Sequence, residues 1–467
     1  MFRKRIDRIM KEYKIKEFIH KKTETVIYSM TAFVEGNTCL LFNKKSGHMF
    51  LTDIECFEMF QSKNISDGLL RKLDNRGFTN KYSANMQPYE CEILPEFFMI
   101  DLTSNCNMRC KYCLRNVGSD NHFLQLSILD GICDFINAYA EKYNLKDISI
   151  QPWGGEPLLA LDLILRLRNK IHPTNTRVHF SIETNGLLLN EQNAQLLYEN
   201  KIGIGISIDG YKQLHDGQRV TKDGKGTHSV VEKNLINSKN LFGSRLGTIT
   251  TITKKNASHV EEILDYFVRD LKLEHVKFNF VHDSLFFNCE ELCVPEEEIS
   301  ETIIRLLNKI VKLNEEGLTI EEHNISVKLR NILTRRFTDI CHSAGCCGGK
   351  KMIVFDMNGG IYPCELTDTP GEAIGNIGDG VDLVKVVNSS ITIQDYFTPK
   401  KEKICDECDW YVFCRGGCTV RAISRGNRPP KIDRIECAVN RSLYPALIEL
   451  ILTKPKIVNK ILGCEIL

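Results

Sequence analysis

The sequence lacks any apolar run that approaches the roughly 18 residues needed to span a membrane, and it contains no internal repeat or low-complexity tract. An excess of charge of one sign is also missing, because 61 basic residues are balanced by 60 acidic ones. This balance argues against nonspecific nucleic-acid binding and against broad attachment to anionic membranes. No apolar segment follows the basic first residues, so we expect no signal peptide and a cytoplasmic protein.

Cysteine, by contrast, is abundant, with 19 residues in the chain. A reducing cytoplasm disfavours disulfides, so this number points to metal binding or catalysis. Three cysteines form a tight group near residue 110, and nine crowd the last third of the chain. The other seven are scattered, and we interpret them as inert buried thiols. They are Cys39, Cys56, Cys91, Cys133, Cys289, Cys293 and Cys464.

The length of 467 residues is enough for two or three domains, and the pattern predicts a small module at residues 1–92. Residues 38–43 and 48–51 are predicted to be two strands, and a helix is predicted to begin near residue 55. An amphipathic segment with leucines follows at 69–73. A hairpin with small helices is consistent with a winged-helix module, and equally with an N-terminal cap on the main domain.

Residues 93–335 alternate between apolar strands and amphipathic helices, which predicts parallel βα units. The predicted strands are 97–102, 148–153, 178–183, 202–208, 246–253 and 276–282. Six units are fewer than the eight of a closed barrel, so we predict a partial (β/α)6 barrel in the α/β class. Its active face would lie at the C-terminal ends of the strands. After about residue 335 cysteines and glycines replace the periodic pattern, which predicts a separate domain at 336–467.

Directly after the first predicted strand, Cys106, Cys110 and Cys113 recur with CxxxCxxC spacing, and Tyr112 precedes the last of them. Three thiolates can hold one four-iron cluster and leave one iron without a protein ligand. This motif resembles that of radical S-adenosylmethionine (SAM) enzymes. The resemblance implies a [4Fe–4S] cluster that binds SAM and cleaves it reductively to a 5′-deoxyadenosyl radical, which abstracts hydrogen from the substrate.

Three later loops on the same predicted face agree with this resemblance. A GGEP sequence ends the second predicted strand, a Thr-Asn-Gly sequence ends the third, and Ile-Ser-Ile-Asp-Gly ends the fourth. In the resembled family GGEP binds the SAM amino group, the serine contacts the ribose and a later arginine contacts the carboxylate. The resemblance therefore implies cofactor contacts from Tyr112, Gly154, Gly155, Glu156, Pro157, Asn185, Ser207 and Arg219. The Thr-Asn-Gly sequence is also compatible with an ordinary turn at a strand end.

The cysteines of the last third supply at least seven thiolates, too many for one tetrahedral site and about right for two. CxxC pairs alone would also fit zinc ribbons. The longer string resembles the SPASM extension of radical SAM enzymes, which holds two auxiliary [4Fe–4S] clusters. The resemblance implies one auxiliary cluster on Cys405, Cys408, Cys414 and Cys437. Cys364 and Cys418 would join two of three upstream cysteines in the other; the candidates are Cys341, Cys346 and Cys347, and Cys346 fits the pattern best.

Glu365 follows Cys364 directly. In anaerobic sulfatase maturases, a SPASM subfamily, an aspartate at the corresponding place acts as a base on the substrate side chain. Glu365 is therefore the candidate catalytic base, the alternative being a structural or solvated carboxylate.

The N-terminal module resembles the winged-helix element by which maturases of ribosomally made peptides bind the leader of a precursor, as a strand added to a sheet edge. We therefore predict a radical SAM peptide maturase that forms a crosslink such as a thioether or C–C bond. A flavodoxin- or ferredoxin-type donor would supply electrons. The alternatives are an anaerobic sulfatase-maturating enzyme, a peptide epimerase or decarboxylase, and a non-catalytic zinc-binding scaffold. We expect no nucleic-acid or membrane partner.

Overall fold

A computed structural model of the chain describes most of its 467 residues. It does not describe 1–9, 21, 45, 81–91, 116–121, 284–288, 335–338, 342–344, 367–372, 391–392, 394–400, 425–431 and 467. Cys91 therefore lies outside the described residues. None of the described helices combines the length and the apolar character needed to cross a membrane.

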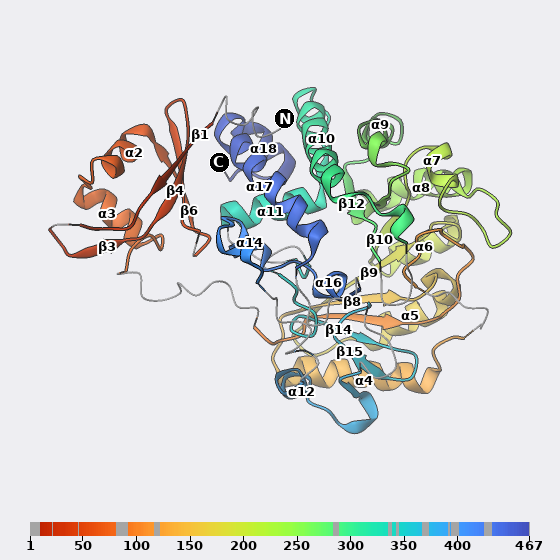
Figure 1. Ribbon diagram of the computed structural model, residues 1–467. Coiled ribbons are helices and arrows are strands. Elements are labelled where there is room, and N and C mark those ends of the chain that lie inside the picture. The colour runs from red at the N-terminus through yellow and green to blue at the C-terminus, as the bar shows by residue number, and fades with distance from the viewer. Residues whose placement is uncertain are drawn as a thin grey trace.

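The N-terminal module is a four-stranded antiparallel sheet with two short helices (Figure 1). Its strand order is β1 (Lys11–Ile15), β4 (Met30–Glu35), β5 (Thr38–Phe42) and β6 (Met49–Asp53), and β2 (Phe18–His20) pairs separately with β3 (Thr25–Ile27). Asp53 caps α2 (Ile54–Gln61) by accepting a hydrogen bond from the Cys56 N–H at 2.9 Å, and α3 (Asp67–Asp74) buries its three leucines. The predicted hairpin and helices are confirmed, whereas β1 to β4 were not predicted.

The main domain is built on a ten-stranded sheet in the order β13-β12-β11-β10-β9-β8-β7-β14-β15-β16. All six predicted strands are present, and each is parallel to its neighbour. They are β7 (Phe97–Asp101), β8 (Asp147–Trp153), β9 (Arg177–Thr184), β10 (Ile202–Ser207), β11 (Leu246–Ile252) and β12 (His275–Phe280). Helices follow the first five strands: α4 (Leu126–Lys142), α5 (Leu161–Lys170), α6 (Glu191–Glu199), α8 (His228–Phe242) and α9 (Val260–Asp265). The predicted succession of six parallel strands with intervening helices is confirmed.

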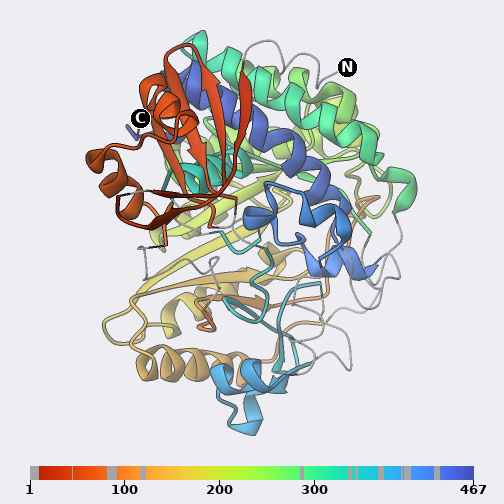
Figure 2. The same ribbon diagram turned by 60° about the vertical axis from the view of Figure 1, so that its left-hand side comes forward.

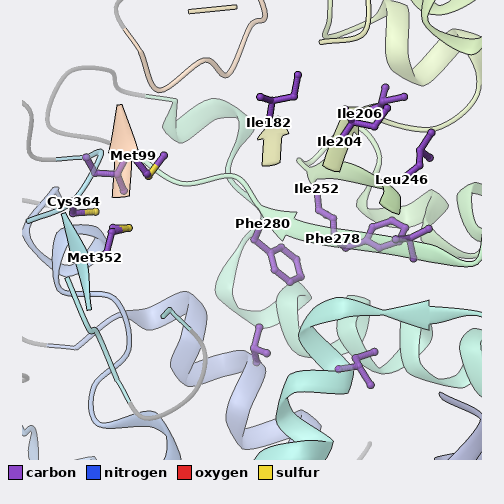
Figure 3. Close-up of a cluster of buried hydrophobic side chains, with 14 of the residues drawn as sticks. Met99, Ile182, Ile204, Ile206, Leu246, Ile252, Phe278, Phe280, Met352 and Cys364 are labelled. Atoms are coloured by element: carbon purple, nitrogen blue, oxygen red, sulfur yellow. The ribbon is translucent and has the colours of Figure 1, made fainter. Parts of the chain in front are cut away.

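Strand residues alternate between two faces of the sheet. In β10 the isoleucines are buried, while glycines and a serine alternate with them. Ile206 and Val231 of α8 both lie close to Gly186 and belong to one buried cluster, so the isoleucine face packs toward the helices. Figure 3 shows Ile182, Ile204 and Phe278 within the same buried cluster. The opposite face of these strands carries smaller and polar side chains, which leaves it available for a site.

The sheet continues across residue 335. On the far side of β7, β14 (Met352–Phe355) runs parallel to it, followed by the antiparallel strands β15 (Gly360–Tyr362) and β16 (Gly375–Asn376). At the other edge, β13 (Glu321–Glu322) pairs with β12. The cysteine-rich part of the chain therefore shares the main sheet.

Long helices join the C-terminal part to the rest of the molecule. α10 (Glu296–Glu315) packs along α17 (Arg434–Thr453), and α18 (Pro455–Leu462) packs against both and against α11 (His323–Thr334). The fully buried Lys328 of α11 forms an ion pair with Glu436 of α17 at 2.6 Å and donates to Asn440 Oδ1 at 2.7 Å. This buried pairing ties the two helices together.

The N-terminal module lies against the C-terminal part (Figures 1 and 2). The Trp410 ring stacks on the Phe42 ring of β5, with 5.5 Å between the ring centroids. It also stacks on the rings of Phe33 in β4 and Tyr444 in α17, with centroid distances of 6.2 and 5.5 Å. Lys14 of β1 forms an ion pair with the neighbouring Asp409. The module is thus docked beside the cysteines at 405–418.

Candidate functional site

The loop after β7 carries the first three cysteines. Cys106 is buried, and Cys110 and Cys113 are half-buried. Burial is the largest cause that raises the pKa of Cys106 to about 11 and that of Cys110 to about 12, and the charge of Cys113 contributes to both. The three thiols therefore act on one another electrostatically, as expected of donors that share one metal centre. Arg219 Nη1 lies 3.9 Å from Cys110 Sγ and offsets negative charge there.

Two glycines hold the end of β8 against this loop. Gly155 N–H donates to the Thr103 carbonyl at 2.8 Å, and Glu156 N–H donates to the Asn105 carbonyl at 2.7 Å. A Cβ atom would lie 2.4 Å from the Thr103 oxygen if placed on Gly154, and 2.2 Å from the Asn105 oxygen if placed on Gly155. Only residues without a side chain allow this close backbone contact.

Replacing Gly155 by alanine is expected to displace the cysteine loop, because the new Cβ would overlap the backbone oxygen of Asn105. Iron content after anaerobic reconstitution should fall by about four atoms per chain, the content of one cluster. The matched control is Gly68→Ala in α3, where an added Cβ meets open space. Full iron content in Gly155→Ala would contradict this account of the loop.

Glu156 links the ends of β8 and β9. The residue is 1% exposed, and its Oε1 accepts hydrogen bonds from the Leu158 N–H at 3.0 Å and the Thr184 hydroxyl at 2.6 Å. Its Oε2 accepts from the Asn185 N–H at 2.8 Å. Burial raises the pKa of Glu156, and these hydrogen bonds oppose the effect. The side chain therefore fixes Asn185, another predicted cofactor contact, at the rim.

A buried charge pair supports the second cysteine. Arg219 Nε donates to Asp209 Oδ2 at 3.1 Å, and the Tyr112 hydroxyl donates to the same oxygen at 2.5 Å. The Arg219 guanidinium also lies over the Tyr112 ring at 5.3 Å. Asp209, the aspartate of the Ile-Ser-Ile-Asp-Gly sequence, is fully buried and was not predicted as a site residue. Its carboxylate orients both predicted cofactor contacts beside Cys110.

The remaining predicted SAM contacts lie along the same edge of the sheet. Ser207 ends β10 and is half-buried, and Asn185 follows β9. Asn185 Nδ2 donates to Asn107 Oδ1 at 2.7 Å and lies 3.8 Å from Cys106 Sγ. Pro157 begins the short helix η1 (Pro157–Ala160) after β8. The predicted contacts thus meet at the C-terminal ends of neighbouring strands.

Four cysteines of the last third line one pocket. They are Cys405, Cys408, Cys414 and Cys437, contributed by α14 (Lys403–Asp406), α15 (Tyr411–Cys414), α17 and the segment between the first two helices. Trp410 also lines the pocket, and the nearby Arg441 lowers the pKa of Cys408 and Cys437 against the raising effect of burial. The structure thus brings together the four residues that the SPASM resemblance assigns to one cluster.

The other predicted cysteines form a second group. Burial, and then the charges of neighbouring carboxylates and thiols, raises the pKa of Cys364 and Cys341. For both, the thiols that act on them are Cys418 and Cys346. Cys341 is exposed as a residue, yet enough protein surrounds its sulfur for desolvation to be the largest cause. The buried Cys347 instead closes a turn, its carbonyl accepting the N–H groups of 350 and 351.

Glu365, which follows β15, acts electrostatically on Glu183 of the main sheet. Its Oε2 accepts a hydrogen bond from the Cys364 thiol at 3.1 Å. Burial raises the pKa of Glu183 in β9, the charge of Lys277 in β12 lowers it, and the charge of Glu365 raises it further. Glu183 alternates with the buried Ile182, so it lies on the face away from the helices. Sequence reasoning missed Glu183 and Lys277, because both lie in strands that alternate polar and apolar residues, so no local pattern singles them out.

Four of the scattered cysteines can be compared with the interpretation as inert buried thiols. Cys39 and Cys133 are buried, as expected. The interpretation is wrong for Cys56, which is half-buried, and for Cys464, which is exposed near the end of the chain.

Comparison with known proteins agrees with this arrangement. Residues 100–267 match the model of the Radical SAM superfamily. The chain is 27% identical over 368 residues to a cysteine-type anaerobic sulfatase-maturating enzyme of Clostridium novyi (strain NT), an alignment that covers 73% of this chain and 92% of that enzyme.

Two solved structures share the fold. Native anSMEcpe with bound AdoMet and Cp18Cys peptide superimposes with a TM-score of 0.65 at 22% identity, covering 76% of this chain and 98% of that one. Streptococcus suis SuiB bound to precursor peptide SuiA superimposes with a TM-score of 0.53 at 14% identity, covering 85% of this chain and 95% of that one.

Residues 100–267 are therefore a radical SAM domain, and the chain is an enzyme. The prediction of an enzyme is confirmed, which sets aside the non-catalytic scaffold. The domain implies a [4Fe–4S] cluster and SAM. Two buried atoms near the cysteine loop, Asn105 Oδ1 and Trp153 Nε1, have no hydrogen-bond partner among the described residues. These unsatisfied polar atoms and the three thiol donors fit a site that binds an iron–sulfur cluster and SAM.

Proposed function

We propose that the chain is a radical SAM maturase that modifies a ribosomally made precursor peptide and forms a crosslink such as a thioether or C–C bond. The N-terminal module beside the radical SAM domain is the observation that carries this proposal. The likeness to SuiB, whose structure contains a precursor peptide, covers 85% of this chain, against 76% for anSMEcpe with its peptide. The likeness to a structure that holds a precursor peptide, over a larger share of the chain, supports a peptide substrate.

In this proposal Cys106, Cys110 and Cys113 hold the cluster that binds SAM. When bound, the two cofactors supply the adenosyl radical that removes a hydrogen atom from the substrate. Arg219 would bind the SAM carboxylate, while Asp209 fixes the direction of its guanidinium. Glu156 would act mainly by holding Asn185, because its oxygens already accept three hydrogen bonds.

The substrate side chain would enter between Glu365, Glu183 and Lys277. Glu365 is the base in this proposal, accepting a proton from the side chain that is crosslinked. Lys277 belongs to β12 and Glu183 to β9, so they flank the path to the SAM site from two strands. Glu183 and Lys277 would bind polar groups of the peptide and so position its side chain.

We assign the auxiliary clusters to the two cysteine groups. Cys405, Cys408, Cys414 and Cys437 would hold one of them. For the other we propose Cys341, Cys346, Cys364 and Cys418, because the charges of these thiols act on one another. An auxiliary cluster would bind the substrate or accept the second electron, and an external flavodoxin- or ferredoxin-type protein would deliver the first.

The leader would add to the edge strand β6. Antiparallel partners alternate between hydrogen-bonded and non-hydrogen-bonded pairs. The Asn43 N–H donates to the His48 carbonyl and the Ile54 N–H donates to the Asn37 carbonyl, so these are hydrogen-bonded pairs. Counting along the register, Leu51 faces Leu40 in a non-hydrogen-bonded pair. The N–H and C=O of Leu51 therefore point away from β5. Leu51 is also 40% exposed. These groups can pair with an added strand.

The experiment is anaerobic incubation of the reconstituted enzyme with SAM, dithionite and the short peptide encoded beside its gene. Loss of two hydrogens from the peptide is expected, and it should depend on the leader. Leu51→Pro removes the outward N–H and should weaken leader binding about tenfold or more, whereas Leu51→Ala should bind normally. An unmodified peptide, with SAM cleaved, would contradict the proposal.

A sulfatase-maturating activity is the second candidate, favoured by the 27% identity over 92% of the Clostridium novyi enzyme. It would convert a cysteine or serine to formylglycine, whose aldehyde a hydrazide probe captures. A crosslinked peptide gives no such product. Unchanged mass in water together with deuterium uptake in D2O would instead indicate epimerisation.

A further inference from the structure

The loop that leaves β12 brings together three metal-ligating side chains outside the groups described above. Cys289 Sγ and Cys293 Sγ lie 3.9 Å apart, and a carboxylate oxygen of Asp283 lies within 4.8 Å of both. Both cysteines are buried, and Asp283 is half-buried. The interpretation of these two cysteines as unrelated inert thiols does not account for their convergence.

A single helical turn creates the cysteine pair. Cys293 N–H donates to the Cys289 carbonyl at 3.2 Å, so the two thiols stand on one side of the turn. A disulfide requires about 2.05 Å between the sulfurs, much less than the observed separation. A tetrahedral zinc ion with Zn–S bonds of about 2.3 Å holds two thiolates about 3.8 Å apart. The observed spacing is thus that of a chelating pair.

We propose that Asp283, Cys289 and Cys293 form a zinc site. Two thiolates and a carboxylate are suited to zinc rather than to magnesium or calcium, which prefer oxygen ligands alone. Three ligands from these residues leave one tetrahedral position for a water molecule or another donor. The Asp283 carboxylate is already held in place, because its Oδ1 accepts the Cys289 N–H at 2.8 Å.

The position of the site gives it a structural role at the mouth of the barrel. Cys289 and Cys293 share a buried cluster with Tyr112, and the half-buried Cys110 packs against this cluster. The Leu292 carbonyl, between the two cysteines, accepts the N–H of residue 254 at 2.9 Å. A bound zinc ion would therefore fix the loop after β12 against the loop that carries the radical SAM cysteines.

The full-length protein is first reconstituted with iron and sulfide, so that the other thiol groups are occupied. It is then incubated with one equivalent of Zn²⁺, desalted, and measured for zinc and iron by mass spectrometry. We expect one zinc per chain, with two sulfur neighbours at about 2.3 Å by X-ray absorption. Cys289→Ala/Cys293→Ala should bind none and keep its iron, and Asp283→Asn should bind zinc about tenfold more weakly.

The matched control is Cys133→Ala/Cys464→Ala, which removes two cysteines elsewhere and should bind zinc as the unchanged protein does. Equal zinc in the Cys289→Ala/Cys293→Ala protein and the unchanged protein would overturn the proposal. So would a loss of iron confined to that variant, since iron would then be the metal at this site. A Cys289–Cys293 disulfide without bound zinc, found by peptide mapping, would also overturn it.

Discussion

Replacing Cys110 by alanine is expected to reduce the reductive cleavage of SAM at least about 1,000-fold, because the cluster at this loop would lose one of three thiolate ligands. Release of 5′-deoxyadenosine in the presence of dithionite is the measurement. Iron content should fall by about four atoms per chain, while the auxiliary groups keep theirs. Burial raises the pKa of Cys110 to about 12, so the metal must displace its proton on binding.

The control for this prediction is Cys133→Ala, which removes a buried thiol from α4 without touching the loop. Cys133→Ala should retain SAM cleavage and full iron content. Cleavage at the ordinary rate in Cys110→Ala would mean that the electron reaches SAM from a different centre. The radical site would then have been assigned to the wrong cysteines.

Replacing Glu365 by glutamine is expected to leave SAM cleavage intact while product formation falls by about 100-fold or more, the range typical of a lost general base. The amide preserves the size of the side chain but cannot take up a proton. The measurement is the ratio of modified peptide to 5′-deoxyadenosine. This ratio isolates the step after hydrogen abstraction.

Two variants separate the role of Glu365 from that of its neighbours. Glu365→Asp keeps a carboxylate and should recover part of the product formation. Glu183→Gln removes a nearby negative charge and should weaken peptide binding more than it changes the ratio. Full product formation by Glu365→Gln would exclude Glu365 as the base.

The sequence predicted the parallel core well because its signals are local. Alternating isoleucines in β10 and the amphipathic helix at α8 follow from the periodicity of strands and helices. The cysteine spacing at 106–113 likewise lies within one loop. The rim residues could be placed because parallel strands bring their C-terminal ends to one edge.

What the sequence could not give depends on contacts between distant segments. The assignment of Cys341 with Cys346 requires the fold of the C-terminal part, because three cysteines compete for two positions in the pattern. The role of Asp209 becomes visible only when Arg219 and Tyr112 meet at its carboxylate. Glu183 in β9 and Lys277 in β12 lie far apart in the sequence, so no local pattern predicts that they act on one another.

The pairing of β7 with β14 has a consequence for how the protein matures. Phe97 lies opposite Met352, so the strand that leads into the radical site gains its second neighbour only after most of the chain has left the ribosome. Until then β7 can pair with β8 alone, and the loop at 106–113 follows a strand that lacks one of its two neighbours. We therefore expect stable loading of iron and sulfide at that loop to follow the synthesis of β14.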